Sequence, residues 1–312
     1  MKGRMNMKKI CVLGSLNIDM TISVPRFNLP GESLTGTGLA IYTGGKGGNQ
    51  SIASARLGAP VSLIGCLGND ANGRMYRDVL AGEGVDVSSV HMTEKALSGT
   101  AFIEVVPSGE NRIAVAQGAN DVLDDEIVAM QEAAIAGCDI FMCQLENPMS
   151  AILEGIRLAN KHGCTVILDP APARPLDGEV LAMCDYITPN ETELEILTGM
   201  PVDSEEAAVA AARTLIEKGA KAVINKRGKA GALLVTKDEA IMYPGFTVKA
   251  VDTTAAGDSF NAGFGVGLAL GKDIESAIRL ANAVGAISTT RPGAQAAMPK
   301  MADVEALMQA QK

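Results

Sequence analysis

The chain is organised around one stretch, VDTTAAGDSFNAG, at residues 251–263. Its pattern predicts a strand end, a tight turn of small residues, and a helix that continues through an apolar, glycine- and alanine-rich segment to Leu270. The first turn of such a helix has unpaired N–H groups and the positive end of the helix dipole, which together favour an anion. Because Ala255, Ala256 and Gly257 carry little bulk, a phosphate or a developing oxyanion can approach their backbone amides closely.

A carboxylate, Asp258, lies in the same turn. A phosphate alone gives no reason for a negative side chain beside it, whereas a base that waits for a hydroxyl proton explains this position. An aspartate at the start of a helix also commonly serves as a cap or interacts with the dipole. The stretch by itself leaves both interpretations of Asp258 open.

Length and charge limit the possible classes of protein. The 312 residues form one large α/β domain or two smaller ones, and either buries a sizeable core. A net charge of −9 argues against a nucleic-acid surface, which needs clustered Lys and Arg. No apolar run approaches the length of a membrane span. We therefore expect neither a nucleic acid nor a membrane as a partner.

The N-terminus and the cysteines favour a cytoplasmic protein. The basic residues 1–9 and the apolar run 10–16 resemble a signal peptide, but the run is short, and Asn17 and Asp19 follow it without a cleavage pattern. We expect residues 9–16 to form a buried strand instead. The six cysteines include no C-x-x-C pair, and the two histidines lie in no ligand-spaced cluster. Free thiols in a reducing cytosol therefore fit better than disulfides or zinc.

The order of the expected elements predicts the fold class. From residue 124 onwards helices and strands alternate, which is typical of an α/β fold with a mainly parallel sheet flanked by helices. β-like segments at about 17–42 and 98–118 do not fit this alternation, and we expect them to form a small β-sheet lid on a single domain, residues 1–312. The expected helices include residues 51–57, one continuous helix at 124–136, and two helices that close the chain, at 259–270 and 274–286.

Polar clusters follow several of the expected strands. In open parallel sheets, ligands bind beyond the carboxyl ends of the strands. Clusters at six strand ends therefore indicate an active-site crevice, and they are Asn17 with Asp19, residues 144–147, Asp169 with Pro170, residues 189–193, residues 226–228 and the turn 252–258.

Residues 44–50, GGKGGNQ, form a glycine-rich segment with one cation and two amides. We expect a flexible loop whose backbone and Asn49 reach a ligand, although a plain glycine turn before a helix explains the pattern as well. It is not a Walker A loop, and no G-x-G-x-x-G follows the first strand, which weakens a dinucleotide-binding interpretation. Asn17 and Asp19 face the same side of an extended chain, where they either hold neighbouring hydroxyls of a polyol or form an Asx turn.

Residues 189–193, PNETE, open a helix that ends near Leu197. The helix dipole is a sufficient reason for one acidic residue in this first turn. Three polar groups at a strand end also suit a hydrated Mg²⁺, which takes one or two carboxylates and keeps several waters.

Together these motifs resemble those of the ribokinase/phosphofructokinase-B family of sugar kinases, and within it the ribokinases. The matches span nearly the whole chain in the family's order, and the turn 252–258 and the segment 44–50 are specific signals. The other matches are residues 14–19, 144–146, 169–174 and 188–193.

The resemblance implies transfer of the γ-phosphoryl group of ATP to the primary hydroxyl of a sugar. It implies Asp258 as the base and the amides of Ala255, Ala256 and Gly257 as an anion hole around the transferred group. The implied sugar contacts are Asn17, Asp19, Gly45, Lys46, Gly47, Asn49, Glu146 and Asp258.

The resemblance also implies ATP, Mg²⁺ and a monovalent cation, K⁺, as cofactors. The implied ATP contacts are Asn190, Lys226, Arg227, Gly228, Gly231, Gly257 and Asn282, and Glu193 is implied to reach Mg²⁺ through water. The implied ligands of the monovalent cation are Asp252, Thr254, Ser288, Arg291, Gly293 and Ala297.

The chain departs from the family pattern at a few positions, none of which removes the catalytic set. The departures are Gly48 and Ser51 for common alanines, Lys226-Arg227-Gly228 for a common Thr-Leu-Gly, Asn282 for a common histidine and Ala297 for a common serine. We expect a kinase for the 5-hydroxyl of a pentose, D-ribose first, that forms a homodimer through its β lid.

Two alternatives remain open. One is a kinase for another acceptor, such as 2-deoxyribose, a hexose or a nucleoside. The other is a sugar-sensing binding protein without turnover, against which the intact turn around Asp258 argues, because a pure binder needs no base. A dehydrogenase is disfavoured by the missing glycine fingerprint.

Overall fold

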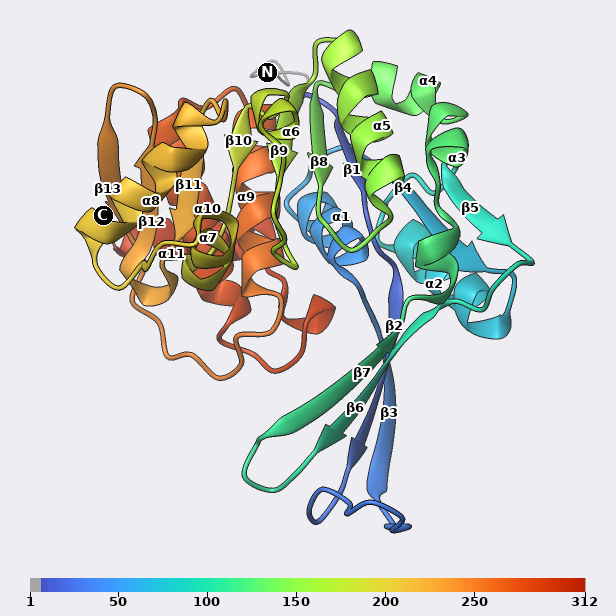
Figure 1. Cartoon of the computed structure of the whole chain (residues 1–312). Coiled ribbons are helices and arrows are strands. Elements are labelled where there is room, and N and C mark those ends of the chain that lie inside the picture. Colours follow the sequence, from blue (N-terminus) through green and yellow to red (C-terminus); the bar gives the residue numbers. More distant parts are fainter. Residues whose placement is uncertain (1–6, 312) are drawn as a thin grey trace.

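In the computed structural model, residues 7–311 are described and form two sheets with flanking helices (Figure 1). The large sheet has nine strands in the order β13-β12-β11-β10-β9-β8-β1-β4-β5. The strands from β11 to β5 pair in parallel, whereas β12 and β13 are antiparallel additions at one edge. The strands are β1 Ile10–Leu13, β4 Val61–Gly68, β5 Val90–Thr93, β8 Ile140–Cys143, β9 Thr165–Leu168, β10 Tyr186–Ile187, β11 Val223–Lys226, β12 Gly231–Val235 and β13 Ala240–Pro244.

The central strands are buried on both faces. All four residues of β1 are buried, and Ile10 lies opposite both Val61 of β4 and Ile140 of β8. Successive side chains enter two different hydrophobic clusters, Ile10 on one face of the sheet and Cys11 on the other. This two-sided burial is why the sequence of the strand is a continuous apolar run.

Helices cover both faces of the large sheet. On one face α1, α2, α9, α10 and α11 supply buried apolar side chains, and on the other α3 to α8 supply them. The layers confirm the predicted α/β class with a mainly parallel sheet flanked by helices. The helices are α1 Lys46–Arg56, α2 Ala71–Gly82, α3 Asp125–Ala129, α4 Glu132–Ala136, α5 Met149–Lys161, α6 Gly178–Ala182, α7 Glu191–Thr198, α8 Glu205–Glu217, α9 Ala256–Ala269, α10 Ile274–Ser288 and α11 Met301–Ala310, with the 3₁₀ helices η1 Gly118–Val122, η2 Gly228–Ala230 and η3 Gln295–Ala297.

A second sheet of four strands, in the order β3-β2-β6-β7, extends away from the helices and the large sheet (Figure 1). Its strands are β2 Asn17–Ser23, β3 Thr37–Gly44, β6 Gly99–Val105 and β7 Asn111–Ala116. They come from the two segments that broke the expected alternation, so the prediction of a second, small sheet is confirmed. The sheet carries apolar side chains that are 50–68% exposed, namely Leu39, Ile41, Phe102, Ile113 and Val115.

The first helix begins earlier than predicted. α1 starts at Lys46 behind the N-cap Gly45, so residues 44–50 are mostly the first turns of a helix and not a flexible loop. The cause is close packing, because a Cβ on Gly47 would lie only 2.6 Å from the Cα of Gly14 at the end of β1. Gly45 has a φ of 83°, a conformation that glycine adopts without strain.

Two other helix predictions are wrong in detail. The expected helix 124–136 is broken into α3 and α4, because the N–H of Gln131 donates to the Val128 carbonyl three residues back, which tightens the turn and ends α3. Three helices close the chain instead of two, since α11 follows and packs Val304 into the core. The comparison of the N-terminus with a signal peptide involved residues 1–6, which lie outside the described residues. No helix within residues 7–311 is long and apolar enough to cross a membrane.

We predict that Gly47→Ala lowers the free energy of unfolding by about 1–3 kcal/mol, the usual cost of overpacking. The added methyl group would meet the backbone of Gly14, which cannot move without displacing β1. Gly82→Ala is the matched control, because Gly82 is also helical, has no atom within 4 Å of an added Cβ, and should tolerate alanine or gain stability from it. Denaturant unfolding measures both variants, and wild-type stability in Gly47→Ala would contradict the packing argument.

Candidate active site

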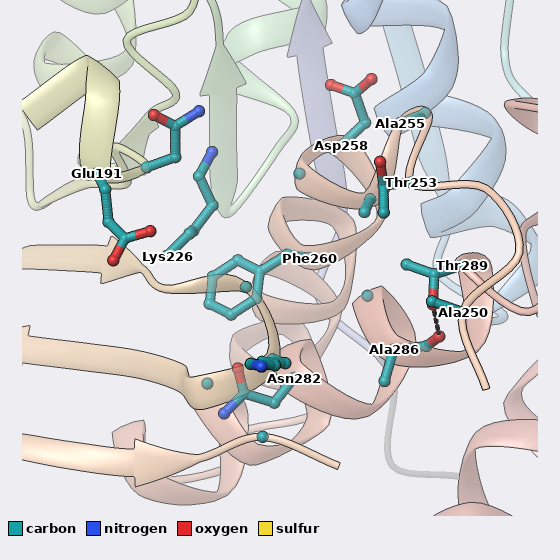
Figure 2. Close-up of a pocket in the computed structure, with 18 of the residues that line it drawn as sticks. Glu191, Lys226, Ala250, Thr253, Ala255, Asp258, Phe260, Asn282, Ala286 and Thr289 are labelled. Carbon is teal, nitrogen blue, oxygen red and sulfur yellow. Dashed lines mark hydrogen bonds between the residues drawn. The ribbon is translucent and has the colours of Figure 1, made fainter. Parts of the chain in front are cut away.

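A cavity of about 810 Å³ opens at the carboxyl ends of the parallel strands. Its lining comes from the start of α9, the ends of β9 and β11, the start of α7, one side of α10 and the segment 245–250. Figure 2 shows Asp258 and Ala255 near the start of α9, whereas Asn282 lies on α10 at the far end of the labelled residues. The position is the edge at which open parallel sheets bind their ligands.

The turn before α9 is strained. Ala255, the N-cap, has a φ of 57°, and it is the only non-glycine residue within 7–311 with a positive φ. Such a conformation costs about 1–2 kcal/mol and is typical of functional turns. The N–H of Ala256 donates to the Thr253 carbonyl at 3.2 Å, so one of the three amides of the predicted anion hole is engaged within the turn. The amide of Gly257 belongs to the first helical turn, which offers it no intrahelical acceptor.

Asp258 is buried and points toward α1. It is 5% exposed, and its carboxylate accepts hydrogen bonds from Asn49 Nδ2 at 2.9 Å and from Gln50 Nε2 at 3.2 Å. α9 begins without a side-chain cap, so Asp258 does not cap its own helix. Burial raises the pKa of Asp258 to about 6, against the opposing effects of Lys46 and of the two amide hydrogen bonds. A carboxylate with this pKa is mostly ionised at pH 7 and can take up a proton.

The predicted sugar contacts gather around the starts of α1 and β2. A Cβ on Gly45 would lie 2.8 Å from the backbone N of Asn17, and the Lys46 N–H lies 3.4 Å from the Glu146 carboxylate. Burial, and then the nearby charge of Glu146, raises the pKa of Asp19 to about 6. The structure thus brings together one polar region that is joined to Asp258 through Asn49 and contains Asn17, Asp19, Gly45, Lys46, Gly47, Asn49 and Glu146.

Lys46 is the cation among these acids. Burial alone would lower the pKa of Lys46, but four carboxylates, those of Asp258, Asp169, Glu146 and Glu193, outweigh burial and raise it. The ammonium group therefore stays charged at physiological pH. Its field in turn opposes the upward shift of the Asp258 pKa and so reduces the cost of keeping that carboxylate ionised.

A second lysine, Lys226 at the end of β11, lies on the cavity side of the turn. Its Nζ is 2.8 Å from Asp169 Oδ1 and 3.8 Å from Glu193 Oε2. The same Nζ lies 3.5 Å from the position that a Cβ on Gly257 would occupy. An anion bound at the amide of Gly257 would therefore be within reach of Lys226.

Most of the predicted ATP contacts line the cavity, namely Asn190, Lys226, Gly228, Gly231, Gly257 and Asn282. Asn190 and Glu193 form the capping box of α7, with hydrogen bonds of 2.7 and 2.8 Å. Arg227 is not among the residues that line the cavity. Its guanidinium lies 3.4 Å from Glu191, which does line the cavity, and 3.4 Å from Asn225 Oδ1. Lys226 and Arg227 are consecutive at a strand end, where neighbouring side chains point to opposite sides.

Asp252 joins the turn before α9 to the loop that follows α10. Its carboxylate accepts from the N–H of Thr254 at 2.9 Å, from the Thr254 hydroxyl at 2.7 Å and from the N–H of Gly293 at 2.8 Å. Burial on its own would raise the pKa of Asp252, but these hydrogen bonds together outweigh burial and hold the pKa below its usual value. In the described part of the chain no hydrogen bond joins Asp252 to the other predicted cation ligands, which are Ser288, Arg291 and Ala297.

Two glutamines of the site were not predicted. Gln50 Nε2 lies 3.0 Å from Asp169 Oδ2 and 3.2 Å from Asp258 Oδ1. Gln295 Nε2 donates to Asn49 Oδ1 at 3.1 Å across 246 positions of sequence. Gln50 directly follows Asn49 in the glycine-rich segment, which is a usable signal, whereas no pattern around Gln295 points to this contact.

Comparisons with known proteins show the family to which the chain is similar. Residues 7–301 match the pfkB family of carbohydrate kinases. A ribokinase from Haemophilus influenzae is 45% identical over 292 residues, which cover 94% of this chain and 95% of that protein. A deoxyribokinase from Salmonella typhi is 36% identical over 293 residues, 94% of this chain and 96% of that protein. The structure of Arabidopsis thaliana ribokinase complexed with ribose and ATP is 31% identical and has a TM-score of 0.93, with 97% of this chain and 99% of that chain covered.

The raised pKa of Asp258 predicts a pH-dependent cost to stability. In the folded protein this carboxyl keeps its proton up to about pH 6, whereas its unperturbed pKa is 3.8. The free energy of unfolding therefore falls as the pH rises from 3.8 through 6. We predict that the stability of Asp258→Asn relative to wild type is about 1 kcal/mol higher at pH 7.5 than at pH 5. Denaturant unfolding of both proteins at the two pH values measures this difference, and equal values at both would contradict the raised pKa.

Proposed function

The chain belongs to the pfkB family of carbohydrate kinases, and we propose that its acceptor is the primary 5-hydroxyl of D-ribose. It is an ATP-dependent sugar kinase, and ribose is supported by the ribokinases among its relatives. The observation that carries the proposal is the place of Asp258. Its buried carboxylate joins the polar region around Asn49 to the strained turn that starts α9.

In the proposed reaction the sugar hydroxyl oxygen attacks the γ-phosphorus of ATP and gives its proton to Asp258. A new P–O bond forms while the bond between the γ-phosphorus and the β,γ-bridging oxygen breaks, which releases ADP. The amide of Gly257 and the ammonium of Lys226 stabilise the charge of the group in transfer. Asn49 and Lys46 hold the carboxylate of Asp258 ionised and oriented toward the sugar.

We propose Mg²⁺ on the ATP side of the site. Within residues 7–311 no three His, Cys, Asp or Glu side chains form a cluster that could hold a metal by themselves. That suits an ion whose other ligands are waters and the phosphates of ATP. Glu193, part of the α7 capping box and 3.8 Å from Lys226, is the residue we propose to reach the ion through water. When bound, Mg²⁺ neutralises phosphate charge during the transfer.

We propose K⁺ at the Asp252 loop. The lowered pKa of Asp252 keeps an anionic oxygen there at any working pH, which suits a monovalent cation. Thr254 and Gly293 already surround this carboxylate, and the remaining proposed ligands are Ser288, Arg291 and Ala297. Unchanged turnover when a large organic cation replaces K⁺ would exclude this part of the proposal.

We also propose that the small sheet is a lid over the sugar and the contact of a homodimer. Asp19 belongs both to β2 and to the polar region around Asp258, so the sheet is positioned to cover the sugar and exclude water from the transfer. Its exposed apolar side chains, defined above, are a surface that a second copy of the chain can cover. Size-exclusion chromatography with light scattering tests this, and a purely monomeric protein would exclude the dimer.

One finding favours a second acceptor, because a deoxyribokinase is among the relatives. Ribose and 2-deoxyribose share the 5-hydroxyl and differ only at position 2. A site that hydrogen-bonds the 2-hydroxyl with buried polar groups discriminates strongly against the sugar that lacks it, since its partners are then left unpaired. Asn17 and Asp19 are the residues we expect to make this distinction.

The acceptor is tested by ADP release from ATP and Mg²⁺ with ribose, 2-deoxyribose, hexoses and nucleosides. We expect the highest kcat/KM with ribose. Turnover with another acceptor and none with ribose would contradict the ribose assignment. Binding of sugar without turnover of any acceptor would favour the sensing protein.

We predict that Asp258→Asn lowers kcat by about 10²–10⁴-fold, the usual contribution of a general base. The variant keeps the shape of the site, so sugar binding by calorimetry should remain measurable. A variant with near-normal kcat would remove Asp258 from the proposed mechanism.

A further inference from the structure

Gln295, the first residue of η3, connects three elements of the site through one side-chain amide. It is 7% exposed, and its Nε2 donates to Asn49 Oδ1 at 3.1 Å and to Tyr76 Oη at 2.9 Å. Its Oε1 accepts the proton of the Thr43 hydroxyl. These partners lie in α1, α2 and β3, so every polar atom of the amide is in use.

The direction of these hydrogen bonds is determined by Tyr76. A tyrosine hydroxyl has one proton, and Tyr76 gives it to the Gly44 carbonyl at 2.5 Å. Tyr76 Oη must therefore accept from Gln295, which requires that Nε2 face it. The second proton of Nε2 then goes to Asn49 Oδ1, so that Asn49 Nδ2 is left to donate to Asp258 Oδ2 at 2.9 Å.

We infer that Gln295 is a positioning residue that holds the amide of Asn49 with its NH₂ group toward Asp258. Without Gln295 the Asn49 amide can turn over when Asp258 is protonated, and its oxygen then accepts the carboxyl proton, which favours the protonated form. Asp258 then keeps only Gln50 as an amide donor. That Asp258 is a base rests on the proposed function, whereas the orientation of Asn49 does not.

The consequence is a change in the pKa of Asp258. The charged groups that face Asp258 are Lys46, which lowers its pKa, and Asp169, which raises it. Neither of them bonds to Gln295, so a substitution there acts through Asn49. The Asn49 hydrogen bond lowers the pKa of Asp258, and its loss should raise that pKa by about one unit, the usual scale of a hydrogen bond to a charged group.

The test is an NMR titration of ¹³C-labelled aspartate carboxyls in wild type and Gln295→Met, without sugar or ATP. Methionine keeps the length of the side chain and removes the amide. We expect the midpoint of Asp258, assigned with Asp258→Asn, to rise by about one pH unit. Asp19 is the internal control, because its raised pKa depends on burial and Glu146. Gln131→Met, just before α4, controls for the substitution itself and should leave both midpoints unchanged.

An unchanged midpoint for Asp258 in Gln295→Met, or an equal rise for Asp19, overturns the inference. Tyr76→Phe is the second variant, should Gln295→Met fail to fold. Because Tyr76 acts through Gln295, Tyr76→Phe alone should raise the Asp258 midpoint by less than one unit, and an unchanged midpoint would overturn the inference. Where Gln295→Met does fold, the double variant should show no larger rise than Gln295→Met, and an additive effect contradicts this order. Since no substrate is present in the titration, its result does not depend on whether the protein phosphorylates any acceptor. A lack of ADP release with every acceptor would contradict the proposed function and leave the inference about Gln295 unaffected.

Discussion

The burial of one carboxylate, that of Asp258, constrains the rest of this site. An ionised carboxylate away from water is costly unless hydrogen bonds and an opposite charge compensate it. Asn49, Gln50 and Lys46 provide that compensation, and all three belong to the first turns of α1. α1 can present them only because it begins directly against the end of β1, where glycine packs on glycine.

In the proposed reaction, the charges of the site are arranged in advance for a polyanion. Lys46 and Lys226 each lie among acids, and Lys226 bonds to Asp169 at 2.8 Å while remaining beside the turn that starts α9. A phosphoryl group that enters the cavity therefore meets cations and amides whose positions are already fixed. Such preorganised donors stabilise developing charge without the cost of reorganising solvent.

Much of the fold follows from local pattern, and the unpredicted parts depend on contacts between distant segments. Continuous apolar strands alternating with helices predict the parallel sheet, and segments that break the alternation predict the second sheet. The start of α1 depends on the contact between Gly47 and Gly14, which helix propensities do not predict. Likewise Gln295 joins Asn49 from the far end of the chain, and Arg227 pairs with Glu191 whereas Lys226, directly before it, bonds to Asp169.

The most direct test of the central claim, that a buried Asp258 accepts the sugar's proton, is the pH dependence of kcat/KM for ribose at saturating ATP and Mg²⁺. Under these conditions the ratio reports ionisations of the enzyme that has bound ATP but no sugar. Because only the ionised carboxylate can act, we predict an acid limb with an apparent pKa near 6. A rate that stays constant down to about pH 4, the range of an ordinary aspartate, would contradict both the burial and the catalytic role of Asp258.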